Sequence, residues 1–236
     1  LLGQFHMDRL FNGLRQLQFD IPALFTSATV MEQVKRLCEK NRQSTARVRL
    51  TVFRGNGGLY DPENHFPNTI IQSWPLPHDH YALDENGLVL GVYPDARKSA
   101  DLFSHLKSNN YLPYYMAALF AKQQRWNDAL ILNNNGNICD ATIANVFLVK
   151  NKKISTPALS EGGVSGVMRR YLLESLPSEG YTIEETKITR NDILAADELF
   201  LSNAIRGIQW VQRVEEKSYN NRECINIYNN LLKKML

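Results

Sequence analysis

The segment from Ala129 to Val149 limits the possible folds of this chain more than any other. Its first part, ALIL at positions 129–132, is a short apolar run typical of a buried strand. The sequence NNGN at 134–137 predicts a tight turn that needs a positive φ angle. Apolar residues from Ile138 to Val149 predict that the chain continues as a strand, with a kink at 141–145. The segment therefore predicts a β-hairpin.

Helical and strand-like patterns alternate on both sides of this hairpin. Leu10, Leu14 and Leu17 recur at helical spacing, whereas RVRLTVF at 47–53 alternates as in a half-buried strand. Similar patterns predict helices near 30–37, 111–124, 167–176 and 222–234, and strands near 68–74, 87–93, 181–187 and 198–202. Prolines and polar residues at 76–86 indicate a linker. We expect a small α+β domain at 1–75 and a larger domain at 87–236.

Composition argues against several classes of protein. Hydrophobic residues make up 44 % of the 236 residues, as in an ordinary globular protein. Lys and Arg exceed Asp and Glu by 27 − 24 = 3 and are dispersed, so charge does not indicate nucleic-acid binding. No apolar run approaches the roughly 18 residues of a membrane span, and the first residues lack a signal-peptide pattern. We expect a cytoplasmic protein with no membrane partner.

The cysteines and the first residue support two smaller expectations. Cys38, Cys139 and Cys224 lie far apart without metal-ligand spacing, so neither a disulfide framework nor a zinc site is indicated. A reducing compartment fits this usage best. The chain starts with Leu1, in the middle of a predicted element, so we expect further residues to precede it in the full protein.

Three motifs in order carry a family resemblance. The run KSNNY at 107–111 precedes an alanine-containing helix, ALILNNNGNICDATIANVFLV occupies 129–149, and STPALSEGGVSGVMRRYLL occupies 155–173. Together they resemble the class IV pyridoxal-phosphate enzymes, which include branched-chain aminotransferase, D-amino-acid aminotransferase and 4-amino-4-deoxychorismate lyase. The resemblance extends from about His6 to Val211. It implies fold type IV, like D-amino-acid aminotransferase: an α+β protein with a small domain and a larger domain around a barrel-like β core.

The resemblance implies that Lys107 binds the cofactor covalently and moves protons at the substrate carbon. Pyridoxal phosphate requires a lysine amine that can lose its proton near neutral pH, and the freed amine can act as base and acid. Taken alone, Lys107 would be read as a surface lysine. The family places a Glu opposite the pyridine nitrogen; here the matching residue is Asp140, one methylene shorter. The alternative for Asp140 is a turn-forming residue beside the hairpin.

Further matches concern the cofactor's phosphate and ring. Arg9, in the sequence HMDRL at 6–10, matches a phosphate-binding Arg of the family, the alternative being an exposed helix charge. The helix start GVMR at 166–169 matches a second phosphate site, although Met168 replaces a frequent hydroxyl residue. Other expected cofactor contacts are Val164 on the ring, Val167 at the helix start, and Asn203 and Ala204 in the turn completing the phosphate site.

Two segments favour a lyase over a transaminase. RGNGGLY at 54–60 and SNAIRGI at 202–208 both resemble segments of the aminodeoxychorismate lyases. The resemblance implies substrate contacts from Arg54, Tyr60, Tyr111 and Arg206. Arg54 could equally be a surface charge at a strand end.

The sequence thus predicts a 4-amino-4-deoxychorismate lyase that releases pyruvate and 4-aminobenzoate, a folate precursor. An amino-acid transaminase of branched-chain or D-amino-acid type is the alternative, because both reactions share the first proton transfer. An inactive cofactor-binding relative is a third reading, motivated by Asp140 and Met168 but opposed by the presence of Lys107. The family is built as homodimers, and the loop 54–64 is the candidate for exchange between subunits.

Overall fold

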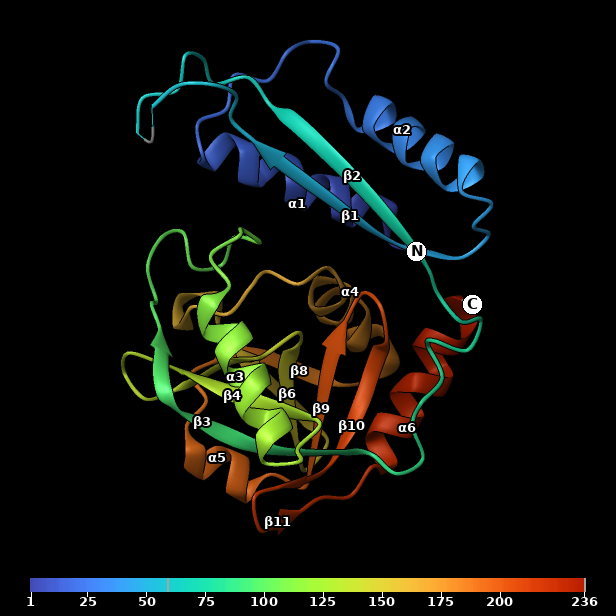
Figure 1. Cartoon of the computed structure of the whole chain (residues 1–236). Helices are drawn as coiled ribbons and strands as arrows, with labels where there is room; N and C mark the ends of the chain where they lie inside the picture. The colour runs from blue at the N-terminus through green and yellow to red at the C-terminus, as the bar shows by residue number, and fades with distance from the viewer. Residues whose placement is uncertain (59, 236) are drawn as a thin grey trace. The chain divides into compact units, whose positions relative to one another are not determined.

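The computed structural model describes residues 1–58 and 60–235 of the chain, which divide into two compact units. The smaller unit spans Gly3–His80, and the larger unit contains Leu1–Leu2 and Tyr81–Leu236. Figure 1 shows both units, and each is described here by itself.

The smaller unit contains two helices and, in its described part, a two-stranded antiparallel sheet. The helices are α1 (Gly3–Gln16) and α2 (Ser27–Lys40), and the strands are β1 (Ala46–Phe53) and β2 (Asn68–Pro75). Helix α2 begins where it does because Thr26 and Thr29 form a reciprocal capping box. Strand β1 alternates between partly buried and exposed residues along most of its length, as its sequence predicts.

The larger unit is organised around one curled sheet, in which nine strands can be counted among the described residues. Its order is β5-β4-β3-β10-β9-β6-β7-β8, with β11 added to β10. The bounds are β3 (Leu88–Lys98), β4 (Asp128–Asn133), β5 (Ile138–Ala141), β6 (Asn145–Lys150), β7 (Lys153–Pro157), β8 (Thr182–Thr186), β9 (Glu198–Asn203), β10 (Gly207–Val214) and β11 (Lys217–Ser218). The amide of Ile138 in β5 donates to Ile188 O, just beyond β8, at 2.8 Å. The two ends of the sheet therefore meet, which gives the barrel-like core.

Helices cover the outside of this barrel. The α-helices are α3 (Leu112–Gln123), α4 (Val167–Ser175), α5 (Arg190–Ala195) and α6 (Arg222–Ile227). Residues such as Leu130 point into the barrel, whereas its neighbours Ala129 and Ile131 pack outward with Ala117 and Ala121 of α3. A second outer cluster joins α4 and α6 to the sheet through residues that include Leu172 and Ile227. Alternating strand residues thus supply both layers.

The structure confirms the predicted hairpin and differs from the sequence pattern elsewhere. Gly136 has φ +78° in the turn between β4 and β5, and the kink separates β5 from β6. Among the strands and α-helices of the described residues, four lacked a sequence prediction: β7, α5, β10 and β11. The last helix is shorter than expected, because α6 ends at Ile227 and a wider π-helical turn, Tyr228–Leu232, follows. That turn buries the adjacent residues Leu231 and Leu232.

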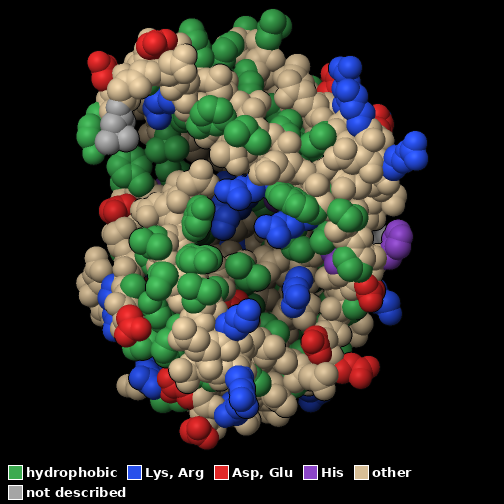
Figure 2. All heavy atoms as spheres, in the orientation of Figure 1, with side chains coloured by type: hydrophobic (Ala, Val, Ile, Leu, Met, Phe, Trp, Pro, Cys, Tyr) green, Lys and Arg blue, Asp and Glu red, His purple; other side chains and the backbone are tan. Residues whose placement is uncertain are grey.

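Surface charge and helix length are two features that a membrane-spanning protein would constrain. On the face of the larger unit drawn in Figure 2, acidic and basic side chains are interspersed. Among the described residues, no helix combines the length and apolarity that a membrane span requires.

Candidate active site

A buried carboxylate lies at the centre of the candidate site. Asp140, in β5, is 2 % exposed. Its Oδ2 atom accepts hydrogen bonds from the Tyr114 hydroxyl at 2.7 Å and the Val164 amide at 2.8 Å, and its Oδ1 atom accepts from Asn145 Nδ2 at 2.9 Å. Strand β5, helix α3, strand β6 and the loop before α4 thus converge on one side chain. Such a set of donors favours the ionised form of the carboxyl.

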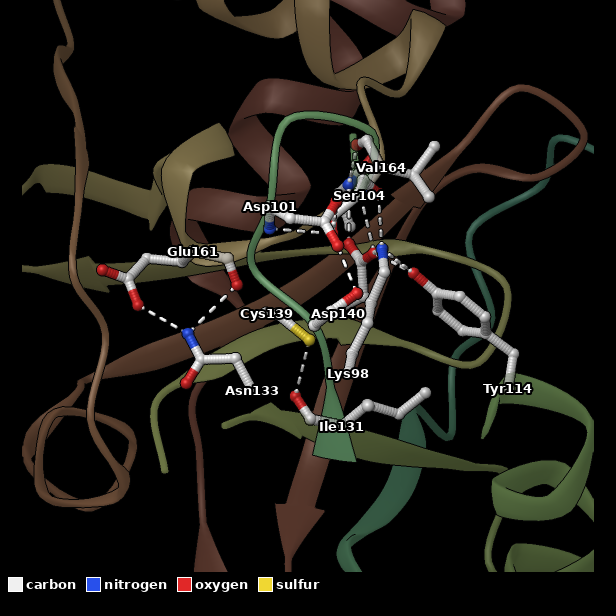
Figure 3. Close-up of polar contacts among 12 residues, drawn as sticks. Lys98, Asp101, Ser104, Tyr114, Ile131, Asn133, Cys139, Asp140, Glu161 and Val164 are labelled. Atoms are coloured by element: carbon white, nitrogen blue, oxygen red, sulfur yellow. Dashed lines mark hydrogen bonds and ion pairs between the residues drawn. The ribbon is translucent and has the colours of Figure 1, made fainter. Parts of the chain in front are cut away.

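A lysine that the motifs did not single out completes this arrangement. Lys98, the last residue of β3, is 8 % exposed, and its Nζ lies 3.7 Å from Asp140 Oδ2. The ammonium donates to Ser104 O at 2.9 Å and to the Tyr114 hydroxyl, which in turn donates to Asp140. Figure 3 shows the three side chains pointing toward one another. They form one connected polar network.

Opposing effects act on the ionisable groups of this network. Burial raises the pKa of Asp140, while the positive charge of Lys98, the hydrogen bonds from Tyr114 and Val164, and the charge of Lys107 lower it. Burial, followed by the charge of Asp140, raises the pKa of Tyr114 well above its ordinary value. Burial and Asp140 also raise the pKa of Cys139 to about 12, so this thiol stays protonated and unreactive at neutral pH.

Lys107, the predicted cofactor lysine, lies in the segment between β3 and α3 with an exposed side chain. Its charge reaches Asp140, since it contributes to lowering the pKa of that carboxyl. This charge is the smallest of the influences on the pKa of Asp140, which lies 33 positions later in the chain (140 − 107 = 33). Tyr111 is the N-cap residue of α3 and is 51 % exposed.

The loop before α4 is held against Asp140 by its backbone. Val164 donates its amide to Asp140, and its carbonyl accepts from Asn145 Nδ2 at 2.8 Å. The approach is close, because a Cβ atom on Gly163 would lie 2.7 Å from Cys139 O. Gly162 has φ +91°, a conformation that favours glycine. The glycines of the sequence EGGVSG therefore allow Val164 to reach the carboxylate.

The start of α4 can bind an anion. Its N-cap is Gly166, and the first two helical residues, Val167 and Met168, are buried. The first amides of a helix lack intrahelical partners and lie at the positive end of the helix dipole. Arg169 is 3 % exposed, donates to Pro157 O at 2.9 Å and pairs with Glu185. This pair, in which Arg169 is buried and Glu185 is partly exposed, anchors the first turn of the helix.

The turn between β9 and β10 lies beside the same region. Asn203 Oδ1 accepts from the amides of Ile205 at 2.9 Å and Arg206 at 2.8 Å, which shapes the turn. The Tyr81 hydroxyl donates to Ala204 O at 2.7 Å. Ser202 pairs with Asn145 across β9 and β6, and Gly166 touches Asn145. Asn145 therefore links the predicted phosphate turn, the α4 start and Asp140. The side chain of Arg206 is exposed.

In the smaller unit, the predicted residues lie on α1 and in the loop after β1. Arg9 is one turn after His6 on α1; burial, and then the charge of Arg9, lower the pKa of His6 to about 4. Tyr60 is 94 % exposed and lines a groove of about 690 Å³ with Arg54 and His65.

Arg54 has a structural role in the smaller unit. Its Nε atom donates to His65 Nδ1 at 3.0 Å and its Nη2 atom to Leu17 O, while the guanidinium stacks 4.2 Å from the Phe19 ring centroid. Arg54 therefore holds the loops around the groove together. Its contact with a substrate stays a prediction, as do the cofactor and substrate contacts of the other predicted residues.

Sequence reasoning missed Lys98, Tyr114 and Asn145 as site residues. Asn145 was within reach, because it belongs to the same motif as Asp140 and follows it by five positions. Lys98 and Tyr114 gave no comparable sign: Lys98 is one of 27 basic residues, and the parallel pairing of β3 with β4 that brings it near β5 is a long-range contact.

Comparison with known proteins places this geometry in context. Residues 1–214 match the family model described as amino-transferase class IV. An aminodeoxychorismate lyase of Vibrio harveyi is 32 % identical over 207 residues, covering 87 % of this chain and 74 % of that protein. A methionine aminotransferase of Arabidopsis thaliana is 29 % identical over 200 residues, covering 81 % of this chain and 56 % of that protein. The structure of a branched-chain amino acid aminotransferase from Escherichia coli matches with a TM-score of 0.84 at 23 % identity, covering 96 % of this chain and 77 % of that one. The predicted fold is confirmed.

Proposed function

Because the chain belongs to the class IV aminotransferase family, we propose that it is a pyridoxal-phosphate-dependent 4-amino-4-deoxychorismate lyase, which releases pyruvate and 4-aminobenzoate. The observation that carries the choice of reaction is the 32 % identity to the Vibrio harveyi lyase over 87 % of the chain. The segments at 54–60 and 202–208, which resemble those of the lyases, support the same choice.

The residues of the larger unit fit the cofactor. Asp140 offers a buried carboxylate to the pyridine nitrogen, and Lys107 offers an exposed amine whose charge reaches that carboxylate. The phosphate would be held by the first amides of α4, at Val167 and Met168, because the start of a helix favours an anion. The turn at Asn203 and Ala204 can contribute to the same site, because Asn145 links its strand to the start of α4. Val164 of this unit would contact the ring, and Arg9, which belongs to the smaller unit, stays a predicted phosphate contact. When bound, the group supplies an electron sink for the substrate carbon.

The protein's own groups then perform binding and proton transfer. The Lys107 amine acts first as a general base that takes a proton from the substrate carbon, and then as a general acid that gives a proton to the departing product. Asp140 stays in place because four elements of the fold hold it. Tyr111 and Arg206 of the larger unit, and Arg54 and Tyr60 of the smaller unit, stay predicted substrate contacts. Loss of pyruvate from the substrate leaves the aromatic product.

Transamination is the second candidate, supported by the methionine aminotransferase that is 29 % identical. It uses the same lysine and the same carboxylate. The two reactions differ in whether the carbanion is reprotonated or expels a leaving group. Contacts beyond Asp140 and Lys107 therefore decide between them.

A product assay separates the two functions. The protein with pyridoxal phosphate is incubated with 4-amino-4-deoxychorismate, and 4-aminobenzoate and pyruvate are quantified. A parallel reaction contains glutamate and a branched 2-oxo acid. We expect equal amounts of 4-aminobenzoate and pyruvate, abolished in Lys107→Ala and retained in Lys122→Ala, which alters an exposed lysine of α3. Amino-acid formation without 4-aminobenzoate would establish the transaminase instead.

The assembly and cellular setting belong to the same proposal. We expect a homodimer in the cytoplasm that supplies 4-aminobenzoate for folate synthesis. Support for a dimer comes from exposed apolar side chains on and before α3: Leu102, Phe103, Tyr111, Leu112, Tyr115, Met116 and Leu119. Leu112, Tyr115, Met116 and Leu119 recur at helical spacing, so they share one face of α3, and an exposed apolar face is typical of protein–protein contacts.

A further inference from the structure

The network around Asp140 contains more than a carboxylate and a facing cofactor require. A buried carboxylate with hydrogen-bond donors is already satisfied, and here Tyr114, Val164 and Asn145 supply three donors. Lys98 adds a full positive charge 3.7 Å from Asp140 Oδ2, in a side chain that is itself 10 % exposed. Burying an ammonium in this way is unfavourable unless it is paired. Its presence therefore calls for a role.

The contacts of Lys98 show that it is held rigidly. Its ammonium donates to Ser104 O and to the Tyr114 hydroxyl and lies 5.0 Å from the centroid of the Tyr114 ring. Ser104 O is itself held in place, because the Ser104 hydroxyl donates to Asp101 Oδ1 at 2.8 Å and the Asp101 amide donates back to Ser104 Oγ at 3.0 Å. The turn at 101–104 thus supplies Lys98 with an acceptor that is separate from Asp140 and Tyr114.

Lys98 and Lys107 differ in what they can do. Lys98 is buried, and its ammonium donates to two oxygen atoms and pairs with Asp140, whereas the side chain of Lys107 is exposed. A cofactor lysine must release its proton and reach its partner, which suits Lys107. A rigid, buried cation suits a different task.

We propose that Lys98 is a positioning residue that keeps Asp140 ionised and oriented toward the cofactor ring, with Tyr114 as the bridge between them. This inference rests on the proposed function in one respect, that Asp140 faces the pyridine nitrogen. The cation compensates for the burial of Asp140, and the Lys98–Tyr114–Asp140 chain of hydrogen bonds limits the rotation of a carboxylate that is one methylene shorter than glutamate. Removing Lys98 leaves a buried charge without its counter-ion.

The proposal predicts a pH-dependent loss of stability in the cofactor-free protein. The groups that act on Asp140 are Lys98 from β3, Tyr114 from α3, Lys107 from the intervening segment and Cys139 from β5, with Asp101 acting through Ser104. Burial raises the pKa of Asp140 in the folded state above its value in the unfolded state. Protonation of Asp140 therefore stabilises the folded protein at low pH, and this contribution to the unfolding free energy is lost as the pH rises. Without the positive charge of Lys98, the pKa of Asp140 rises further, and the unfolding free energy falls more between low and high pH.

The test compares urea midpoints of cofactor-free wild type, Lys98→Met and the matched surface variant Lys122→Met at about pH 5 and about pH 8. We expect Lys98→Met to lower the midpoint more at the higher pH, and Lys122→Met to leave it unchanged. In an Asp140→Asn background, the pH-dependent part of the Lys98→Met effect should vanish. Equal losses at both pH values, or the same pH dependence without Asp140, would overturn the proposal.

Two further measurements keep the proposal testable. If Lys98→Met does not fold, Tyr114→Phe removes the bridging hydroxyl and should give a smaller loss with the same pH dependence; a loss equal at both pH values would overturn the proposal. Titration with pyridoxal phosphate should show at least ~10-fold weaker binding to Lys98→Met, with the visible band retained. A band lost in Lys98→Met but kept in Lys107→Ala would make Lys98 the cofactor lysine and overturn the proposal. A wild type without any band, but with the predicted stability pattern, would refute the proposed function and leave the network intact.

Discussion

At the scale of single residues, the site is defined by the enclosure of Asp140. Its two oxygens accept hydrogen bonds from three described donors, and the Lys98 ammonium lies near Oδ2. A short carboxylate in such surroundings has little freedom to turn. We infer that Asp140 and its surroundings are adapted to each other, so that the family's glutamate would no longer fit.

Restoring the family residue tests this inference. Asp140→Glu adds one methylene to a side chain that is 2 % exposed, and overpacking of this kind lowers the unfolding free energy by about 1–3 kcal/mol. We expect a loss in that range by urea unfolding, accompanied by weaker cofactor binding. Asp95→Glu, at an exposed position of β3, serves as the control and should be neutral. A variant at Asp140 with unchanged stability and tighter cofactor binding would show that the pocket accommodates glutamate.

The sequence predicts some of these residues and not others, for a physical reason. Lys107 and Asp140 lie in local motifs, where neighbouring residues carry the information. Lys98 and Tyr114 gain their roles from sheet pairing and helix packing that bring distant segments together. A side chain whose role depends on tertiary contacts has no local pattern by which it can be recognised.

At the scale of elements, the start of α4 is the most constrained part of the site. The φ angle of Gly166 is −70°, which any residue can adopt, so the backbone conformation does not require glycine. Glycine is required here because there is no space for a side chain. A Cβ atom there would lie 1.9 Å from Asn145 Oδ1, and Asn145 is already bound to Asp140 and Val164. Any shift of Asn145 therefore disturbs both the Asp140 carboxylate and the loop that contains Val164.

Gly166→Ala should therefore affect stability and phosphate binding together. We expect the unfolding free energy to fall by about 1–3 kcal/mol and the affinity for pyridoxal phosphate to drop at least ~10-fold, as measured by urea unfolding and cofactor titration. Gly136→Ala is the control: its site is open but has φ +78°, so backbone strain of about 1–2 kcal/mol should appear without a change in cofactor affinity. Equal cofactor affinities in Gly166→Ala and wild type would contradict this account of α4.

At the scale of the whole molecule, the barrel explains how much of the fold the sequence could predict. The hairpin of β4 and β5 follows from local turn chemistry, and most helices follow from apolar spacing. Strand β10 is central to the sheet yet had no prediction, and it pairs in parallel with β3, more than a hundred residues earlier. The closing contact between Ile138 and Ile188 also joins distant positions, since 188 − 138 = 50. Local patterns supply elements, whereas closure depends on non-local pairing.

The exposed face of α3 carries a prediction about assembly. Leu112 is 65 % exposed and Tyr115 56 %, and in a homodimer built through this face both would be buried. Leu112→Glu combined with Tyr115→Glu would place unpaired charges in the contact and should weaken dimerisation at least ~10-fold. Light scattering across a dilution series measures the effect. Leu24→Glu, at a residue of the smaller unit that is 85 % exposed, is the control. A wild type that remains monomeric at high concentration would contradict the dimer.

The most direct test of the central claim is an absorbance spectrum of the protein with pyridoxal phosphate, before and after addition of 4-amino-4-deoxychorismate. We predict a visible band in the wild type and in Lys122→Ala that is absent from Lys107→Ala, because the proposed function assigns the covalent bond with the cofactor to Lys107. The band should shift when 4-amino-4-deoxychorismate is added, with release of pyruvate. A wild type without a band, or a Lys107→Ala variant whose band matches the wild type, would contradict the assignment of Lys107 as the cofactor lysine.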